Sequence, residues 1–165
     1  MVLDDLCMKD SMSVNTIILY QINQPRVSLK EEVSHIGEYI ELERTRFQET
    51  LRIEFNSTPI QDHIMVPPML LMPFVENAFK HGALKDGYIR IAINVSVVED
   101  RLEFKVQNSA ETDEEQVKGN GIGLENIKKR LELHYADQYR LNQEMFEGIY
   151  LVHLIIDDLK ALKNA

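Results

Sequence analysis

Large apolar residues recur regularly along residues 88–98, where isoleucine or valine occupies every second position from Ile89 to Val97 and mostly polar residues lie between them. Successive side chains of a strand point to opposite faces, so this stretch predicts a long strand with one buried face. The alternation resumes over residues 102–106 after the turn residues Glu99 and Asp100, which predicts an antiparallel hairpin. Its apolar face must be covered by other segments of the chain.

Helical and extended patterns on both sides of the hairpin predict the segments that cover its apolar face. Ser28 and Glu31 form the pattern of a capping box at the start of a helix over residues 29–50. A second helix is predicted over residues 69–80, with Gly82 ending it in the left-handed conformation. Further predictions are strands at 51–55, 139–141 and 148–156, a turn at 56–59 and a helix over 124–134. The expected class is α+β, a two-layer sandwich of a mostly antiparallel mixed sheet with helices on one face and an N-terminal helical leader.

Charge and cysteine content exclude several functional classes. The 165 residues include 18 basic and 27 acidic ones, and the net charge of −9 repels nucleic acids and anionic lipid surfaces. Cys7 is the only cysteine, which excludes a disulfide framework and fits a reducing compartment. The apolar stretch 64–75 is too short to cross a bilayer and contains three prolines. We therefore expect one compact domain with no nucleic-acid partner and no membrane contact.

The helix predicted over residues 69–80 carries polar side chains suited to a nucleotide. At 100° per residue, Asn77 lies at the margin of its apolar face beside Lys80 and His81, and Glu76 is turned further away. An amide oxygen can join hydrated Mg²⁺, a lysine can meet phosphate, and an imidazole can lie against a base. An ordinary amphipathic helix with solvated polar residues would show the same pattern, so this helix needs corroboration.

A glycine-rich segment some forty residues later, with Gly119, Gly121 and Gly123, corroborates a nucleotide site. Glycines permit close backbone approach to phosphates, and the helix beginning near Leu124 directs free N–H groups at them. Glycine loops also serve as connectors, so the signal is weak in isolation. No strand leads straight into the loop and no Gly-Lys-Ser/Thr follows, which excludes a Rossmann fingerprint and a P-loop. The polar residues 109–118 before it predict a mobile lid.

Residues 67–82 resemble the asparagine box of the GHKL ATPases, in the Glu-Asn-Ala-x-Lys-His-Gly form of LytS-type sensor histidine kinases. Residues 119–133 resemble the second glycine box of that family and the helix after it. Similar segments occur at 27–32, 39–43, 46–47 and in the final strand, so the resemblance covers about residues 25–158. It implies a Bergerat-type sandwich, with a helical leader at 1–50 from the connecting region and an ATP-binding catalytic domain at 51–165.

The resemblance implies ATP and Mg²⁺ as ligands. By matching position, Asn77 would coordinate Mg²⁺, Lys80 would contact phosphate and His81 would lie against the adenine. The matching positions of the triphosphate loop and the pocket wall are Gly119, Gly121, Gly123 and Leu124. Glu76 matches an acid typical of the family, for which a catalytic role and a structural or solvated one both stay open.

Two departures from the family pattern affect what the resemblance implies. Asn108 stands where an aspartate usually accepts a hydrogen bond from the adenine amine, so it would accept without charge. The sequence contains no His-Phe-Leu-Phe-Asn-type phosphoacceptor segment, and its histidines other than His81 are poor substitutes: His35, His63, His134 and His153.

The resemblance thus implies the catalytic portion of a two-component sensor histidine kinase, which presents Mg-ATP to a histidine on a dimerisation helix absent from this sequence. The implied partners are the dimerisation and phosphoacceptor helices of the same kinase and a response regulator, in a homodimeric full-length protein. Its location would be the cytoplasmic side of a membrane-anchored sensor. The alternatives are a nucleotide-binding regulatory module without kinase activity and another GHKL ATPase, such as an anti-sigma serine kinase.

Overall fold

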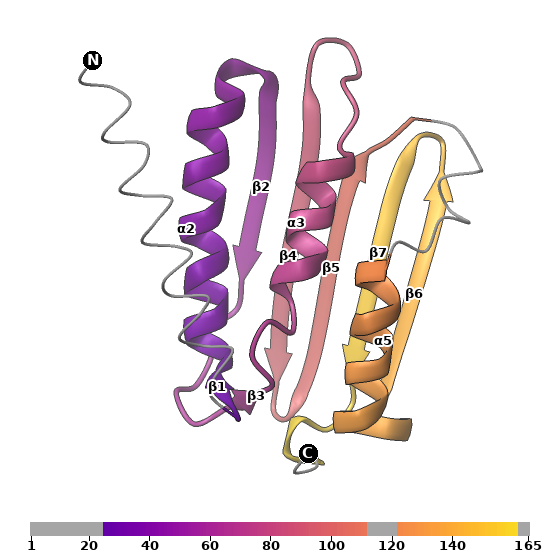
Figure 1. The fold of residues 1–165 in the computed structure, drawn as a ribbon. Coiled ribbons are helices and arrows are strands. Elements are labelled where there is room, and N and C mark those ends of the chain that lie inside the picture. Colours follow the sequence, from indigo (N-terminus) through magenta and orange to yellow (C-terminus); the bar gives the residue numbers. More distant parts are fainter. Residues whose placement is uncertain (1–24, 112–121, 162–165) are drawn as a thin grey trace.

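The computed structural model describes residues 25–111 and 122–161, which form two layers (Figure 1). The main sheet contains β2 (Leu51–Ser57), β4 (Ile89–Val98), β5 (Arg101–Ser109), β6 (Tyr139–Phe146) and β7 (Ile149–Ile156). One face of this sheet is covered by α2 (Leu29–Phe47), α3 (Met72–His81) and α5 (Ile122–Tyr135). The strand order is β2-β4-β5-β7-β6, with β2 parallel to β4 and the other pairs antiparallel. The predicted α+β sandwich is confirmed.

The predicted hairpin is the centre of the sheet. Strands β4 and β5 pair from Ile91 with Asn108 to Val98 with Arg101, and their inward residues join the core. Ile93 and Phe104 are fully buried, and burial of side chains of this size stabilises a fold by about 1.5–3 kcal/mol each. The opposite face of the sheet carries no helix among the described residues and holds the polar half of the alternation (Figure 1).

The start of α2 differs from the sequence prediction. Ser28 is in the N-cap position, but its side chain makes no capping hydrogen bond. Its backbone belongs instead to the short strand β1 (Val27–Ser28), which pairs with β3 (Met65–Val66), and Leu29 N–H donates to the Ile64 carbonyl at 2.9 Å. The predicted capping box with Glu31 is therefore wrong, and contacts with the segment before α3 fix the start of α2.

Gly82 ends α3 for a different reason from the predicted one. Its φ of −62° and ψ of 123° are extended, so the left-handed cap is wrong. A Cβ at Gly82 would lie 2.7 Å from Cγ2 of Ile89 and 3.0 Å from the Ala78 carbonyl oxygen. Close packing against β4 requires glycine here, and Ala83 N–H then donates to the Ser109 carbonyl at 2.7 Å.

Several element boundaries are also shifted. Helix α2 ends at Phe47 and continues as a 3-10 turn over Gln48–Thr50, because Gln48 has a positive φ of 50°. Likewise α3 starts at Met72, because Met69 has a φ of 58°. Strand β6 is longer than predicted since it pairs with β7 along its whole length. In the described ranges, no helix is long and apolar enough to cross a membrane.

Candidate functional site

Helix α3 lies between α2 and α5 over the sheet (Figure 1). Its Phe79 ring contacts α2, with centroids 5.4 Å from Tyr39 and 6.2 Å from Phe47. Glu76 lies one turn before Phe79 and so shares this edge of the helix. Burial raises the pKa of Tyr39, and the nearby charges of Glu43 and Glu76 raise it further. Glu76 is therefore on the side of α3 that faces α2, and its own partial burial raises its pKa.

Asn77 is rotated about 100° from Glu76 and is half-buried on the edge of α3 that faces away from α2. His81, one turn later, shares this edge and is exposed, as is Lys80 at the same end of the helix. In Figure 1, α5 begins on this side of α3. The structure thus groups Asn77 with His81 and separates both from Glu76, an orientation that favours a structural role for Glu76.

Asn108 is the last inward-facing residue of β5 and is only 2% exposed. Its side-chain nitrogen donates to the Ser109 carbonyl at 3.0 Å and to the His81 carbonyl at 3.5 Å. It therefore ties the C-terminal end of α3 to the sheet, beside the predicted base-contacting residue. Its side-chain oxygen is the atom with which Asn108 would accept a hydrogen bond from a ligand.

The glycine-rich loop is largely outside the described residues. Gly119 and Gly121 are among the residues not described, together with most of the predicted lid. Gly123 is in the first turn of α5, and Leu124 after it is half-buried and contacts the core. The convergence of the glycine loop on Asn77 therefore stays a prediction.

Glu32 of α2 is a buried residue that the sequence analysis did not single out. It is 2% exposed, and its Oε1 accepts hydrogen bonds from the N–H groups of Leu71 at 2.6 Å and Met72 at 3.4 Å. Burial raises its pKa to about 7, although these hydrogen bonds and the charge of Arg130 act in the opposite direction. A signal for it exists in the sequence, since Glu32 precedes the buried Ile36 and Ile40 at a spacing of four residues.

Arg130 of α5 holds the same segment from the other side. Its Nη1 donates to the Met69 carbonyl at 3.2 Å, and its Nη2 donates to the Pro68 carbonyl. Met69 has a left-handed φ of 58°, a conformation that costs a residue with a side chain about 1 kcal/mol. The chain entering α3 is thus fixed by side chains from both α2 and α5.

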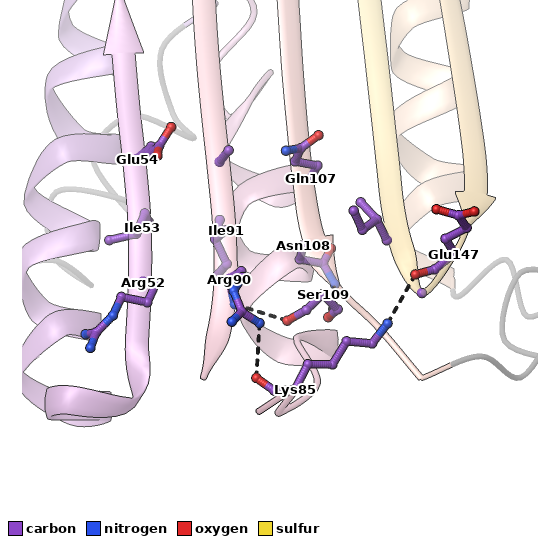
Figure 2. Close-up of a pocket in the computed structure, with 13 residues that line it drawn as sticks. Arg52, Ile53, Glu54, Lys85, Arg90, Ile91, Gln107, Asn108, Ser109 and Glu147 are labelled. Atoms are coloured by element: carbon purple, nitrogen blue, oxygen red, sulfur yellow. Dashed lines mark hydrogen bonds between the residues drawn. The ribbon is translucent and has the colours of Figure 1, made fainter. Parts of the chain in front are cut away.

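A cavity of about 590 Å³ lies on the open face of the sheet (Figure 2). Arg52, Lys85 and Arg90 border it, and the Arg52 guanidinium lies 4.1 Å from the centroid of the Tyr88 ring. Of the predicted site residues that the structure describes, Asn108 alone borders this cavity. Asn77, Lys80 and His81 belong to α3, which covers the opposite face of the sheet (Figure 1).

The donor groups of the described residues indicate which kind of metal site they can form. Within residues 25–111 and 122–161, no group of three or more His, Cys, Asp or Glu side chains could hold a metal ion. A site of the zinc type is therefore not built there. The amide oxygen of Asn77 fits Mg²⁺, which takes few protein ligands and completes its shell with phosphate and water oxygens.

No family model matches the chain. It is 29% identical over 119 residues to the sensor histidine kinase BtsS of Escherichia coli K12, a match that covers 70% of this chain and 21% of BtsS. It is 27% identical over 129 residues to the sensor protein kinase HptS of Staphylococcus aureus USA300, covering 78% of this chain and 22% of HptS. The chain therefore spans about one fifth of the length of these curated relatives.

Solved structures of histidine kinases share the fold. The nucleotide-free catalytic domain of ThkA matches with a TM-score of 0.60 and 16% identity, over 82% of this chain and 97% of that domain. Full-length ShkA in complex with AMPPNP matches with a TM-score of 0.58 and 16% identity, over 85% of this chain and 32% of ShkA. ThkA in complex with the response regulator TrrA matches with a TM-score of 0.52 and 16% identity, over 90% of this chain and 47% of that one. The chain therefore has the fold of a histidine kinase catalytic domain and is similar in sequence to sensor histidine kinases.

Proposed function

We propose that the chain is the ATP-binding catalytic portion of a LytS-type sensor histidine kinase on the cytoplasmic side of a membrane-anchored sensor. In this role it binds ATP with Mg²⁺ and presents the nucleotide to a histidine on a dimerisation helix of the same kinase. Similarity to BtsS and HptS supports the proposal, as does the fold shared with the AMPPNP complex of ShkA.

One observation carries the proposal. Asn77 and His81 share the edge of α3 that faces away from α2, with Lys80 at the same helix end and the buried Asn108 beside them. This arrangement offers a metal-binding oxygen, a cation, an aromatic ring and a buried amide to a ligand. A nucleotide with its metal requires such a set of groups.

The contribution of the chain is placement and charge neutralisation, which supply most of the catalysis in phosphoryl transfer. Bound ATP would supply the phosphoryl group. Asn77 would hold the metal-bound phosphates, Lys80 would neutralise phosphate charge, and His81 with Asn108 would orient the base. The phosphorylated kinase, a homodimer, would then pass its phosphoryl group to a response regulator. The complex of ThkA with TrrA supports this last step by analogy.

Calorimetric titration of the purified chain with Mg-ATP tests the proposal. The variant Asn77→Ala should weaken binding in Mg²⁺ by roughly tenfold or more. Asn142→Ala is the matched control, because Asn142 is an exposed asparagine of β6 and should bind as the wild type does. Absence of binding at millimolar nucleotide, with or without Mg²⁺, would contradict the proposal.

A second candidate is a regulatory module that binds nucleotide without transferring phosphate. The uncharged, buried Asn108 favours it, because its amide already donates to two backbone carbonyls and would hold adenine without a charge-assisted bond. Incubating the chain and labelled ATP with the dimerisation helix in trans separates the candidates. A kinase labels the histidine in an acid-labile form, a serine kinase yields acid-stable product, and a regulatory module yields none.

A further inference from the structure

Helix α3 begins without a cap of its own. Its N-cap residue Leu71 has no side-chain capping hydrogen bond, and its first turn contains no acidic residue. The N–H groups at a helix start need acceptors when they are buried. Pro73 has no N–H, and Phe74 N–H donates to the Leu71 carbonyl at 3.1 Å. The N–H groups of Leu71 and Met72 are left, and both donate to Glu32.

We propose that Glu32 is a positioning residue for the nucleotide site, through which α2 caps α3 and fixes the place of Asn77. This inference rests on the proposed function of that site. Asn77 lies six residues after Leu71, so the capped end is about 9 Å from it along the helix axis. An α-helix is stiff over this length, and a shift at its start therefore moves Asn77.

The surroundings of Glu32 explain why this residue can fix the position of Asn77 from the start of α3. The segment before α3 is joined to α2 by the β1–β3 pair and by the Leu29 N–H to Ile64 carbonyl bond. From the other side, Arg130 of α5 holds the carbonyls of Pro68 and Met69. Glu32 completes this arrangement at the first residues of α3 itself. A displacement of α2 would thus reach Asn77 through Glu32.

Glu32 is also poised to change its charge. Its second oxygen, Oε2, is buried and has no hydrogen-bond partner among the described residues. The groups that face it are Arg130 and Tyr135 of α5, and Tyr135 in turn lies in the field of Arg26. Burial outweighs these neighbours and raises the pKa of Glu32 to about 7. The carboxylate and the acid differ in strength as acceptors for the two N–H groups.

Three variants in the full chain test the proposal. Glu32→Leu removes the acceptor at similar size, Glu32→Gln keeps an acceptor oxygen, and Glu31→Leu is the control, because Glu31 is the exposed neighbour on the same helix turn. We expect Glu32→Leu to weaken Mg-AMPPNP binding by roughly tenfold. Binding by Glu32→Gln should stay within about threefold of the wild type, and Glu31→Leu should leave it unchanged. A folded Glu32→Leu variant with wild-type affinity would overturn the proposal.

A measurement without nucleotide tests the positioning role of Glu32 if Glu32→Leu does not fold or if the wild type does not bind nucleotide. In NMR spectra of the wild type between pH 5 and pH 9, the amides of Leu71 and Met72 and the side-chain amide of Asn77 should titrate together, about the raised pKa of Glu32. In Glu32→Gln this common titration should vanish. An Asn77 signal that does not follow Leu71 and Met72 would overturn the positioning role, whereas failure of nucleotide binding alone would overturn the proposed function.

Discussion

Polar groups have different surroundings on the two faces of the sheet. On the helix-covered face, the polar residues Glu32 and Asn108 are each 2% exposed, and each bonds backbone groups of another element. On the open face, polar side chains pair with one another near water, as in the Glu103 pairs with Lys105 at 2.8 Å and with His153 at 2.9 Å.

This difference follows from solvation. A buried polar group loses its water and must find a partner, so each one fixes the relative position of two elements. An exposed pair exchanges water for a partner at little net gain. We therefore expect substitutions on the helix-covered face to change stability and ligand binding, and substitutions on the open face to change little.

The largest difference in the loss of stability is expected between substitutions at two adjacent residues of β5. Phe104 is fully buried, and its ring centroid lies 5.9 Å from that of Phe74 in α3. Phe104→Ala should reduce the free energy of unfolding by about 4 kcal/mol through lost contacts and a cavity. Lys105→Ala, on the open face, should change it by less than about 0.5 kcal/mol. Urea denaturation measures both, and similar losses for the two variants would contradict the distinction between the faces.

The buried carboxyl of Glu32 should make stability depend on pH. Its pKa rises to about 7 on folding, so between the ordinary glutamate value and about 7 the folded chain holds a proton that the unfolded chain has released. The contribution of Glu32 is therefore full below the ordinary value and is lost as the pH rises through about 7, a loss of about 3 kcal/mol. Glu32→Gln should remove this slope, as measured by denaturation at several pH values. An unchanged slope in Glu32→Gln would assign the dependence to other groups.

A smaller effect is expected where Asn108 joins β5 to α3. Asn108→Asp replaces a donor with a carboxyl that faces the carbonyl oxygens of His81 and Ser109. We expect a loss of about 2 kcal/mol at neutral pH, because acceptors then face acceptors in a buried place. Asn142→Asp on β6 is the exposed counterpart and should be nearly neutral. Equal unfolding midpoints for the two variants would refute this expectation.

The smallest effect is expected for the ion pairs of the open face. The hydrogen bond from Lys105 and, to a smaller extent, His153 lower the pKa of Glu103. The stabilisation is present above the ordinary glutamate value and is lost as the pH falls through the lowered one. Glu103→Gln should cost less than about 0.5 kcal/mol at neutral pH, and added salt should reduce even that. A loss as large as that of Asn108→Asp would show that this face is not simply solvated.

Much of the fold could be predicted because its elements have local signals. The alternation around Ile93 and Phe104 shows which side chains enter the core, and the turn at Glu99 and Asp100 sets the hairpin. The edge of α3 that carries Asn77 follows from helical geometry alone. The resemblance to GHKL ATPases added the expected ligand, which periodicity could not supply.

The remaining features depend on contacts between distant segments. Ser28 has the residue type of a cap, but pairing with β3 determines its backbone. Gly82 has the residue type of a left-handed cap, yet the proximity of Ile89 is what requires it. Glu32 accepts from Leu71, which lies 39 residues further along the chain, so no local pattern predicts its partner.

The parallel pairing of β2 with β4 has a consequence for the order of assembly. The hairpins β4–β5 and β6–β7 each join strands that are neighbours in sequence, whereas β2 meets β4 only across the α3 crossover and β5 meets β7 only across α5. Contacts between distant segments form slowly, because loop closure costs entropy before the contacts compensate for it. We therefore expect the two hairpins to form before β2 docks on β4 and before β5 docks on β7, so that Glu32 reaches the start of α3 late in folding.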